Sequence, residues 1–472
     1  MQYISTRGSA PTLDFEQVTL TGLANDGGLY LPAEWPRWSE AEIAALAGLP
    51  YAELATRVMQ PFVGDSLTED ELRTMCETAY GRFAHAAVTP LKQFDEQQWL
   101  LELFHGPTLA FKDVALQMLG LLFEKFLSRT DSHLTIVGAT SGDTGSAAID
   151  AVAGRERIDI FMLHPDGRIS DVQRRQMTTV LAPNVHNIAI DGSFDDAQAS
   201  VKRMFNDGAM NSRFRIGAVN SINWARLMAQ VVYYFAAALQ LGAPKRKVAF
   251  SVPTGNFGDV FAGYVAAQMG LPIERLIVAT NVNDILHRAL AHGDYSAGTV
   301  TPTTAPSMDI QVSSNFERAL FDAYDREAPA IVQLMDELKE GGFDVSQGAM
   351  QVLQQHYASG RASEQETADT IAATLTSASE LLCPHSAIGV KVAEEQRVTG
   401  TPMVTLATAH PAKFPDAVER ATGFRPNLPS RVGDLFAREE AFSELPGDYE
   451  AVKAVVAELE SMSKNIKGKD QI

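Results

Sequence analysis

Apolar residues recur on nearly every side of a helix predicted for residues 109–122, just after the helix breakers Gly106 and Pro107. Thr108 stands where an N-cap is expected. A helix with so wide an apolar face should be mostly buried. It carries Lys112, although burying an unpaired ammonium group is costly enough to favour the neutral amine. The pattern therefore predicts a buried helix with an unusual lysine near its start.

Beyond this helix, short apolar runs alternate with segments of helical periodicity. The runs predict strands at residues 134–138, 158–163, 185–190, 247–252, 275–280 and 402–408. Helices are expected between them, at residues 146–153, 170–181, 194–205, 220–241 and 259–269, and residues 316–400 are predicted to be rich in helix. Such an alternation is typical of parallel sheets with crossover helices. The chain is therefore predicted to belong to the α/β class.

The N-terminal region and the later connection have different patterns. Residues 1–92 predict two capped helices, and Ser39 and Glu42 form a capping box at the start of the first. The second is predicted at residues 66–80, whereas residues 297–315 are rich in Ser, Thr and Pro and predict an irregular connection. The expected domains are an N-terminal domain (1–92), a smaller α/β domain (93–215), a larger α/β domain (216–430) and a C-terminal helical tail (431–472).

Composition narrows the class of protein. Of the 472 residues, 46% are hydrophobic and 21% are charged, which is typical of a soluble globular chain with sizeable cores. The net charge of −19 argues against a nucleic-acid-binding surface. The charge suits a soluble cytoplasmic enzyme, and we expect no nucleic-acid partner.

The cysteines and the apolar stretches indicate a compartment. Cys76 and Cys383 cannot make a disulfide framework, and neither stands in a CxxC or Cys/His pattern that would indicate a metal site. The opening sequence MQYISTRGSA lacks the charged and apolar regions of a signal peptide. The apolar stretch 227–243 is too short to span a bilayer. We expect a cytoplasmic protein without a membrane partner or a bound metal.

Two loops share one physical form, a buried strand followed by glycines and then a helix. They are TSGDTG at residues 140–145 and PTGNFG at residues 253–258. The glycines let backbone N–H groups approach a ligand, and the helix start adds unpaired N–H groups and a positive dipole end. Neither loop matches the P-loop or the dinucleotide fingerprint. Each is a candidate anion site, and the alternative for each alone is a tight strand-to-helix turn.

The side chains of the two loops suit different anions. In the first loop, the hydroxyls of Thr140, Ser141 and Thr144 suit a carboxylate. In the second, the Thr254 hydroxyl and the Asn256 amide suit a phosphate.

The amine of Lys112 completes the candidate site. A dehydrated lysine is partly neutral, and the neutral amine condenses with aldehydes to give a Schiff base. The alternative is that Lys112 pairs with Asp113 or reaches solvent. Thr408 follows a predicted strand, at the end where ligands of parallel sheets bind, although it also suits a cap. An imine-forming lysine with a phosphate loop and a carboxylate loop indicates a pyridoxal-phosphate site.

Five ordered motifs carry a resemblance to a known family. HGPTLAFKD, ATSGDTGSAA, NSIN, PTGNFGD and TAHPAKF, between residues 105 and 414, resemble the motif series of the threonine synthases of the longer bacterial and fungal kind. The resemblance covers nearly the whole chain. It implies pyridoxal 5'-phosphate as cofactor and the type II fold, similar to the tryptophan synthase β subunit. That fold has two open, mostly parallel sheets with helices on both faces, here preceded by a helical N-terminal region.

The resemblance also implies a role for each matching residue. Lys112 would bind the cofactor as a Schiff base and then act as a mobile acid and base. Thr408 would face the pyridine nitrogen with a neutral hydroxyl, which leaves that nitrogen less firmly protonated than a carboxylate would. The cup for the cofactor phosphate would be formed or bordered by Gly255, Asn256, Phe257, Gly258 and Asp259. The substrate carboxylate site would be lined by Thr140, Ser141, Gly142, Asp143 and Thr144.

Two positions depart from the expected motifs. Relatives in the wider fold group often have Asn where this chain has Asp143, so a contact of Asp143 with the cofactor ring does not follow from the resemblance. Cys383 stands where Asp is common in the family, while His385 and Ser386 match.

The implied reaction converts O-phospho-L-homoserine and water into L-threonine and phosphate, by γ-elimination followed by β-addition of water. The leaving phosphate requires cations, for which Arg226, Lys413 and Arg168 are candidates, with ordinary surface or helix charges as the alternative. His105 and His410 are candidates for assisting proton transfer, with a structural role as the alternative.

Two other functions are compatible with the same lysine or the same loops. A serine/threonine dehydratase or a β-replacing synthase would share the lysine and the phosphate cup but need no site for a second phosphate. A non-catalytic homologue would bind a phosphorylated ligand without using the lysine. The assembly is expected to be a monomer or a homodimer.

Overall fold

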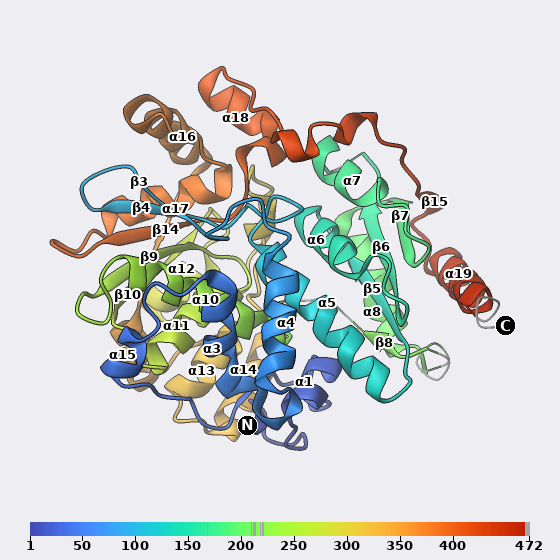
Figure 1. Cartoon of the computed structure of the whole chain (residues 1–472), viewed down its shortest axis with the longest axis horizontal. Helices are drawn as coiled ribbons and strands as arrows, with labels where there is room; N and C mark the ends of the chain where they lie inside the picture. Colours follow the sequence, from blue (N-terminus) through green and yellow to red (C-terminus); the bar gives the residue numbers. More distant parts are fainter. Residues whose placement is uncertain (168, 209, 211–213, 218, 220, 468–472) are drawn as a thin grey trace. The chain divides into compact units, whose positions relative to one another are not determined.

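The computed structural model describes residues 1–467 except 168, 209, 211–213, 218 and 220. The chain divides into two compact units, each containing one large sheet (Figure 1). The larger unit comprises residues Met1–Ala115 and Ser221–Pro426, and the smaller comprises Leu116–Asn220 and Asn427–Ile472.

The sheet of the larger unit has the strand order β13-β10-β9-β14-β4-β3 and is parallel except for the edge pair β3–β4. β14 is held between two strands, because Thr405 is in register with both Leu100 and Ser251. The strands are β3 (Leu91–Gln93), β4 (Gln98–Glu102), β9 (Val248–Pro253), β10 (Ile273–Thr280), β13 (Tyr357–Arg361) and β14 (Met403–Ala407). β13 lies in the segment 316–400, for which the sequence predicted mainly helix.

Helices cover both faces of this sheet. Side chains alternate between the faces of a strand, so neighbouring residues of β9 meet different helices. Ala249 packs in one cluster with Ile388 of α17 (Pro384–Glu395). Phe250 instead contacts the ring of Tyr234 on α10 (Trp224–Gln240), with the ring centroids 4.9 Å apart. The other helices of 220–400 are α11 (Gly258–Gln268), α12 (Ile285–His292), α13 (Phe316–Ala323), α14 (Ala328–Lys339), α15 (Gln347–His356) and α16 (Glu364–Ala378).

The irregular connection predicted at residues 297–315 contains one short 3-10 helix, η2 (Pro306–Met308). Before it, β11 (Asp294–Ser296) pairs antiparallel with β12 (Gly342–Asp344). After β14 come η3 (Pro411–Lys413) and α18 (Pro415–Thr422).

The N-terminal region is mainly helical and belongs to the larger unit. Ser39 caps α2 (Glu40–Ala44) with Glu42 in a capping box, as predicted. The second capped helix, predicted at residues 66–80, starts later than predicted, because Ser66 ends the 3-10 turn η1 (Gly64–Ser66) and Thr68 caps the helix that follows. The remaining elements are β1 (Tyr3–Ser5), paired with β2 (Tyr30–Pro32), and the helices α1 (Phe15–Thr21), α3 (Tyr51–Val63) and α4 (Glu69–Tyr80).

The sheet of the smaller unit is parallel, with the order β15-β7-β6-β5-β8. Phe161 and Leu163 of β6 share an apolar cluster with Met204 of α8 and Val452 of α19, and α6 also packs on β6. The strands are β5 (Leu134–Ala139), β6 (Ile158–Pro165), β7 (Val185–Asp191), β8 (Ile216–Gly217) and β15 (Ser443–Pro446). The helices are α6 (Asp143–Val152), α7 (Asp171–Thr178), α8 (Phe194–Asn206) and α19 (Tyr449–Lys467), with the turns η4 (Ser430–Val432) and η5 (Leu435–Ala437).

Two large, mostly parallel sheets with helices confirm the predicted fold class. The four-domain division stays a prediction, because a compact unit can contain more than one domain. No helix in the described part of the chain is both long enough and apolar enough to cross a bilayer.

The lysine helix is α5 (Lys112–Arg129), and Lys112 is its first residue. Most of its apolar side chains are buried, as predicted, including Val114, Leu116 and Phe126 at 0% exposure. Thr108 was predicted to be the cap, but its backbone N–H and hydroxyl both donate to the carboxylate of Asp113.

Gly120 permits the close packing of α5 on α6. A Cβ atom at Gly120 would lie 2.4 Å from the carbonyl oxygen of Ala151. We predict that Gly120→Ala lowers the thermal unfolding temperature, with a cost of about 1–3 kcal/mol, because backbone has to move to remove the clash.

Gly348 of α15 is the matched control for this substitution. A Cβ atom there meets nothing within 4 Å, so Gly348→Ala should leave the unfolding temperature unchanged or raise it slightly. Equal unfolding temperatures for Gly120→Ala and wild type would contradict the close packing.

Candidate active site

Lys112 is buried at the start of α5. Its side chain belongs to a residue that is 7% exposed, and Nζ donates to Ser307 Oγ at 3.4 Å. Nζ also lies 5.5 Å from the ring centroid of Phe111. The expectation of a buried amine is met, so the alternative that Lys112 extends into solvent is wrong.

The backbone before Lys112 is attached to the segment that follows β14. Ala110 and Ala409 form an antiparallel bridge. On either side of it, Phe111 N donates to Thr408 O at 2.8 Å, and His410 N donates to Leu109 O at 3.0 Å. Leu109 has φ +65, a left-handed conformation that costs a non-glycine residue about 1–3 kcal/mol. The hydrogen bonds of this bridge offset that cost and fix where α5 begins.

The loop PTGNFG connects β9 to α11. Its residue Phe257 has φ +61, also left-handed, and is the N-cap of α11. A left-handed residue beside a helix start turns successive N–H groups toward one concave surface, which is a common anion site. A Cβ atom at Gly255 would lie 2.6 Å from Ser307 O, so only glycine fits. Ser307 therefore contacts both the loop and the Lys112 amine.

The carbonyl groups of this loop are held by residues 313–315. Ser313 Oγ donates to Gly255 O at 2.7 Å. Asn315 donates to Asn256 O twice, from its backbone N at 3.1 Å and from Nδ2 at 2.9 Å. In a planar trans peptide the N–H points opposite to the C=O, so the N–H groups of Asn256 and Phe257 face the other way.

These N–H groups are available to a ligand. Among the described residues, no acceptor is recorded for the N–H groups of Asn256, Phe257 or Gly258, and the first N–H groups of a helix have no partner within it. Together with the positive end of the α11 dipole they suit a phosphate. We call residues 255–258 the phosphate cup. Its backbone donors and the nearby buried amine fit pyridoxal 5'-phosphate.

The Asp259 carboxyl group is directed toward α10. Tyr233 OH and Tyr234 OH both donate to Asp259 Oδ1, the second at 3.3 Å. Burial raises the pKa of Asp259 to about 7, and the hydrogen bonds from the two tyrosines oppose the rise. Asp259 can therefore border the phosphate cup through its backbone while its side chain is engaged elsewhere.

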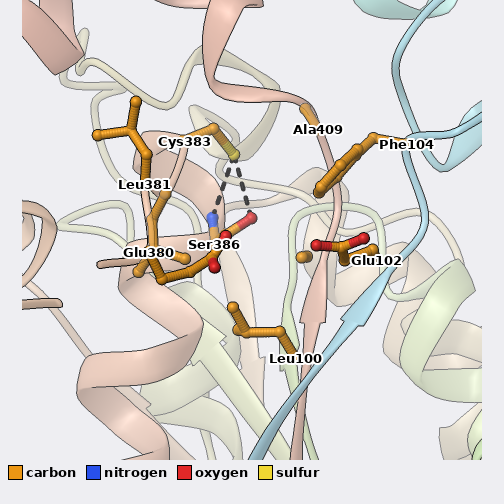
Figure 2. A pocket seen from close by; sticks show the side chains of 10 residues that line it. Leu100, Glu102, Phe104, Glu380, Leu381, Cys383, Ser386 and Ala409 are labelled. Atoms are coloured by element: carbon orange, nitrogen blue, oxygen red, sulfur yellow. Dashed lines mark hydrogen bonds between the residues drawn. The ribbon is translucent and has the colours of Figure 1, made fainter. Parts of the chain in front are cut away.

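Thr408 follows β14 and is 5% exposed. Its N–H donates to Ser386 Oγ at 3.2 Å. Ser386 Oγ in turn lies 3.1 Å from Cys383 Sγ, which also accepts from Ser386 N at 3.4 Å and so caps α17. Figure 2 shows Cys383 and Ser386 beside a small pocket whose lining includes Glu102 and Phe104. Cys383 thus performs the capping that an Asp would perform, and no disulfide involves it.

Two of the three cationic candidates, Arg226 and Lys413, are buried. Lys413 is fully buried, and its Nζ donates to Thr108 O at 2.8 Å. Arg226 is 4% exposed, and burial lowers its pKa to about 10. Arg168 lies outside the described residues.

The two candidate histidines have structural contacts. His105 Nε2 lies 2.7 Å from Glu102 Oε2. His410 Nδ1 accepts from Ala412 N at 3.1 Å and caps η3.

The loop TSGDTG lies in the smaller unit and opens α6. Thr140 Oγ1 accepts from Gly142 N at 3.0 Å and from Gly145 N at 2.9 Å, so this hydroxyl shapes the loop. Ser141 and Thr144 are partly exposed, and no hydrogen bond of their hydroxyls is recorded within the described residues. These two hydroxyls are therefore the ones available to a carboxylate.

Gln173 of α7 clamps this loop and was not predicted from the sequence. Its Nε2 donates to Asp143 Oδ1 at 3.0 Å, and its Oε1 accepts from Ser170 Oγ at 3.1 Å. A Cβ atom at Gly142, where φ is +127, would lie 2.5 Å from Gln173 Cδ. In the sequence, the spacing of Ser170 and Gln173 is typical of a capping box, which marks the start of a helix but not a contact with the TSGDTG loop.

We predict that Asp259→Asn changes how stability depends on pH. The pKa of Asp259 is about 7 when folded, so between about pH 4 and pH 7 the folded state retains a proton that the unfolded state releases. Stability from this group is therefore lost as the pH rises through that window. Because Asn does not titrate, the unfolding temperature of Asp259→Asn relative to wild type should rise from about pH 5 to about pH 8.

Glu366→Gln is the control for this titration. Hydrogen bonds from Ser363 lower the pKa of Glu366 to about 2, so its substitution should show no such rise in the same window. Unfolding temperatures of wild type and Asp259→Asn that run parallel across the window would contradict the raised pKa.

Comparisons with known proteins agree with this geometry. Residues 2–80 match the family model "Threonine synthase N terminus", residues 84–337 match "Pyridoxal-phosphate dependent enzyme", and residues 386–456 match "Threonine synthase, C-terminal". The threonine synthase of Pseudomonas aeruginosa is 55% identical over 461 residues, which cover 97% of this chain and 98% of that protein.

Solved structures give the same result. The PLP-bound threonine synthase of Brucella melitensis has a TM-score of 0.96 and 54% identity, covering 97% of this chain and 99% of that one. The threonine synthase of yeast has a TM-score of 0.93 and 39% identity, covering 98% and 99%. The chain therefore belongs to the threonine synthase family of pyridoxal-phosphate-dependent enzymes.

Proposed function

We propose that the protein converts O-phospho-L-homoserine and water into L-threonine and inorganic phosphate. The observation that carries the proposal is the buried Lys112 amine, joined through Ser307 to the backbone N–H groups of the phosphate cup at residues 255–258. Family membership over nearly the full chain supports this reaction in preference to the other reactions of pyridoxal enzymes.

The phosphate cup would hold the phosphate of pyridoxal 5'-phosphate, through the N–H groups of Asn256, Phe257, Gly258 and Asp259, with Gly255 leaving room for it. When bound, this cofactor would withdraw electrons from the substrate and so acidify the proton on its α-carbon. Thr408 would face the pyridine nitrogen. Its position is fixed by the bonds of its N–H to Ser386 and of its carbonyl to Phe111.

Lys112 would be the base that removes the α-proton and then a β-proton of the substrate, and the acid that returns a proton at the γ-carbon. Dehydration favours its neutral form, which is the form that accepts a proton. The hydroxyl of Ser307 would orient Nζ between these tasks.

The smaller unit would bind the substrate carboxylate. Ser141 and Thr144 would donate their hydroxyls to it, while Thr140 and Gly142 shape the loop and Gln173 fixes Asp143. For the leaving phosphate, Arg226 and Lys413 are the proposed cations. Both are buried, where a charge interacts with an anion more strongly than at the surface.

We place the protein in the cytoplasm, because its two cysteines are buried free thiols, as expected in a reducing compartment.

Purified protein with bound cofactor should release phosphate from O-phospho-L-homoserine and form threonine in equal amount. Free phosphate and threonine are measured together, and serine is offered separately while keto acid is measured. Formation of keto acid from serine at a higher rate than phosphate release would instead support a dehydratase.

Lys112→Ala should lower turnover about a thousandfold or more, because the group that transfers the protons is lost. It should also lose the near-visible absorption band of the cofactor joined to the lysine. Lys125→Ala, on the same helix, is the control and should keep both. A Lys112→Ala protein that keeps its turnover would refute the role of this lysine. If wild type is itself inactive and Lys112→Ala still binds the phosphorylated ligand, the protein would instead be a non-catalytic homologue.

A further inference from the structure

Arg318 of α13 is an arginine in the core of the larger unit. It is 0% exposed. Its Nε and Nη2 donate to Tyr30 O at 3.0 and 2.7 Å, and Nη2 also donates to Ile222 O at 2.6 Å. Nη1 donates to Asn315 Oδ1. All of these acceptors are uncharged oxygens. They satisfy the N–H donors of Arg318 but do not balance its positive charge.

The charge of Glu317 acts on Arg318, but its carboxylate is engaged with other groups. Glu317 forms an ion pair with Arg7 at 3.0 Å and accepts from Thr6 Oγ1 at 2.6 Å. Burial lowers the pKa of Arg318 to about 9, and Glu317 only partly opposes this. At neutral pH the guanidinium is still charged, and an unbalanced buried charge costs stability. A nearby anion would offset that cost.

Arg318 is connected to the phosphate cup through one side chain. The amide of Asn315 accepts from Arg318 and donates to Asn256 O at 2.9 Å. The same Nδ2 donates to Ser221 O at 3.2 Å. Two residues of the NSIN motif thus supply backbone acceptors, Ser221 to Asn315 and Ile222 to Arg318. This gives the motif a role that the reaction itself did not explain.

We propose that Arg318 is a positioning residue for the cofactor phosphate: it orients the cup through Asn315 and supplies positive charge that balances the bound phosphate. The proposal rests on the proposed function of residues 255–258. Its physical basis is that Arg318 is a buried cation whose hydrogen-bond acceptors are all uncharged. Only the side chain of Asn315 separates it from the phosphate cup, whose N–H groups suit a phosphate dianion. In a low-dielectric interior such charges interact well beyond hydrogen-bond distance.

Arg326 offers a matched control. It follows α13, and its Nη1 donates to Pro32 O at 3.0 Å and to Ala33 O at 2.5 Å, so it binds the same N-terminal strand region as Arg318. Its charge is paired with Asp322 at 2.7 Å, and no contact with the cup is recorded for it among the described residues. Loss of Arg326 therefore removes similar structural bonds without removing charge from the cup.

The experiment compares how strongly apoproteins bind pyridoxal 5'-phosphate and pyridoxal, which lacks the phosphate. The proteins are wild type, Arg318→Met, Asn315→Asp and Arg326→Met. The dissociation constant of pyridoxal divided by that of pyridoxal 5'-phosphate measures how much the phosphate group contributes to binding, independently of turnover. The ratio should fall about tenfold or more in Arg318→Met, the usual range for a lost charge interaction. Asn315→Asp should also lower it, because its carboxylate neutralises Arg318 and no longer donates to Asn256.

Arg326→Met should lower the unfolding temperature and leave the ratio unchanged. If Arg318→Met does not fold, Asn315→Asp alone decides, since it retains the size of the side chain. Equal losses of affinity for both ligands would overturn the proposal and leave Arg318 a structural residue. A wild type that does not distinguish the two ligands would instead refute the phosphate cup itself.

Discussion

Exclusion of water from the Lys112 amine is the constraint on which the larger unit depends. A lysine in water is protonated and cannot act as a base or a nucleophile at neutral pH. The chain places Lys112 at the first position of a helix that is buried nearly all round. The left-handed Leu109 sets the direction of entry, and the bridge between Ala110 and Ala409 holds it. Strain and hydrogen bonds thus act together to position a single amine.

The mostly irregular residues 307–315 serve the amine and the phosphate cup together, and Arg318 lies on the helix α13 that follows them. Ser307 contacts Lys112, Ser313 and Asn315 hold the carbonyls of the cup, and Arg318 is linked to it. An irregular segment suits this task, because its backbone and side chains can point donors in directions that a helix or strand does not permit. The regular sheet provides the fixed frame, and this segment provides the fine positioning.

The sequence was sufficient to predict those parts of the fold and the site that depend on patterns among neighbouring residues. Strand and helix alternation gave the parallel sheets, glycines next to strand ends gave the two loops, and the apolar surroundings of Lys112 gave its burial. It was insufficient where partners are distant in the chain. Ser307 meets Lys112 across 195 positions, and no periodicity marks such a pair. β13 was missed because it is short and lies between helices, and the helix predicted from residue 66 starts later because Thr68, not Ser66, is its cap.

The bonds from Arg318 to Tyr30 span 288 positions of the chain. Through Arg318 and Asn315, the phosphate cup is thus linked to the N-terminal strand β2. A ribosome adds about 5–20 residues per second, so many seconds separate the emergence of Tyr30 from that of Arg318. For most of that interval residues 255–258 of the cup have not been made, and Arg318 is missing until its end. Under our proposal, cofactor capture has to wait for these later residues. The family's cofactor would then be acquired late in synthesis or after it, as a final step in maturation.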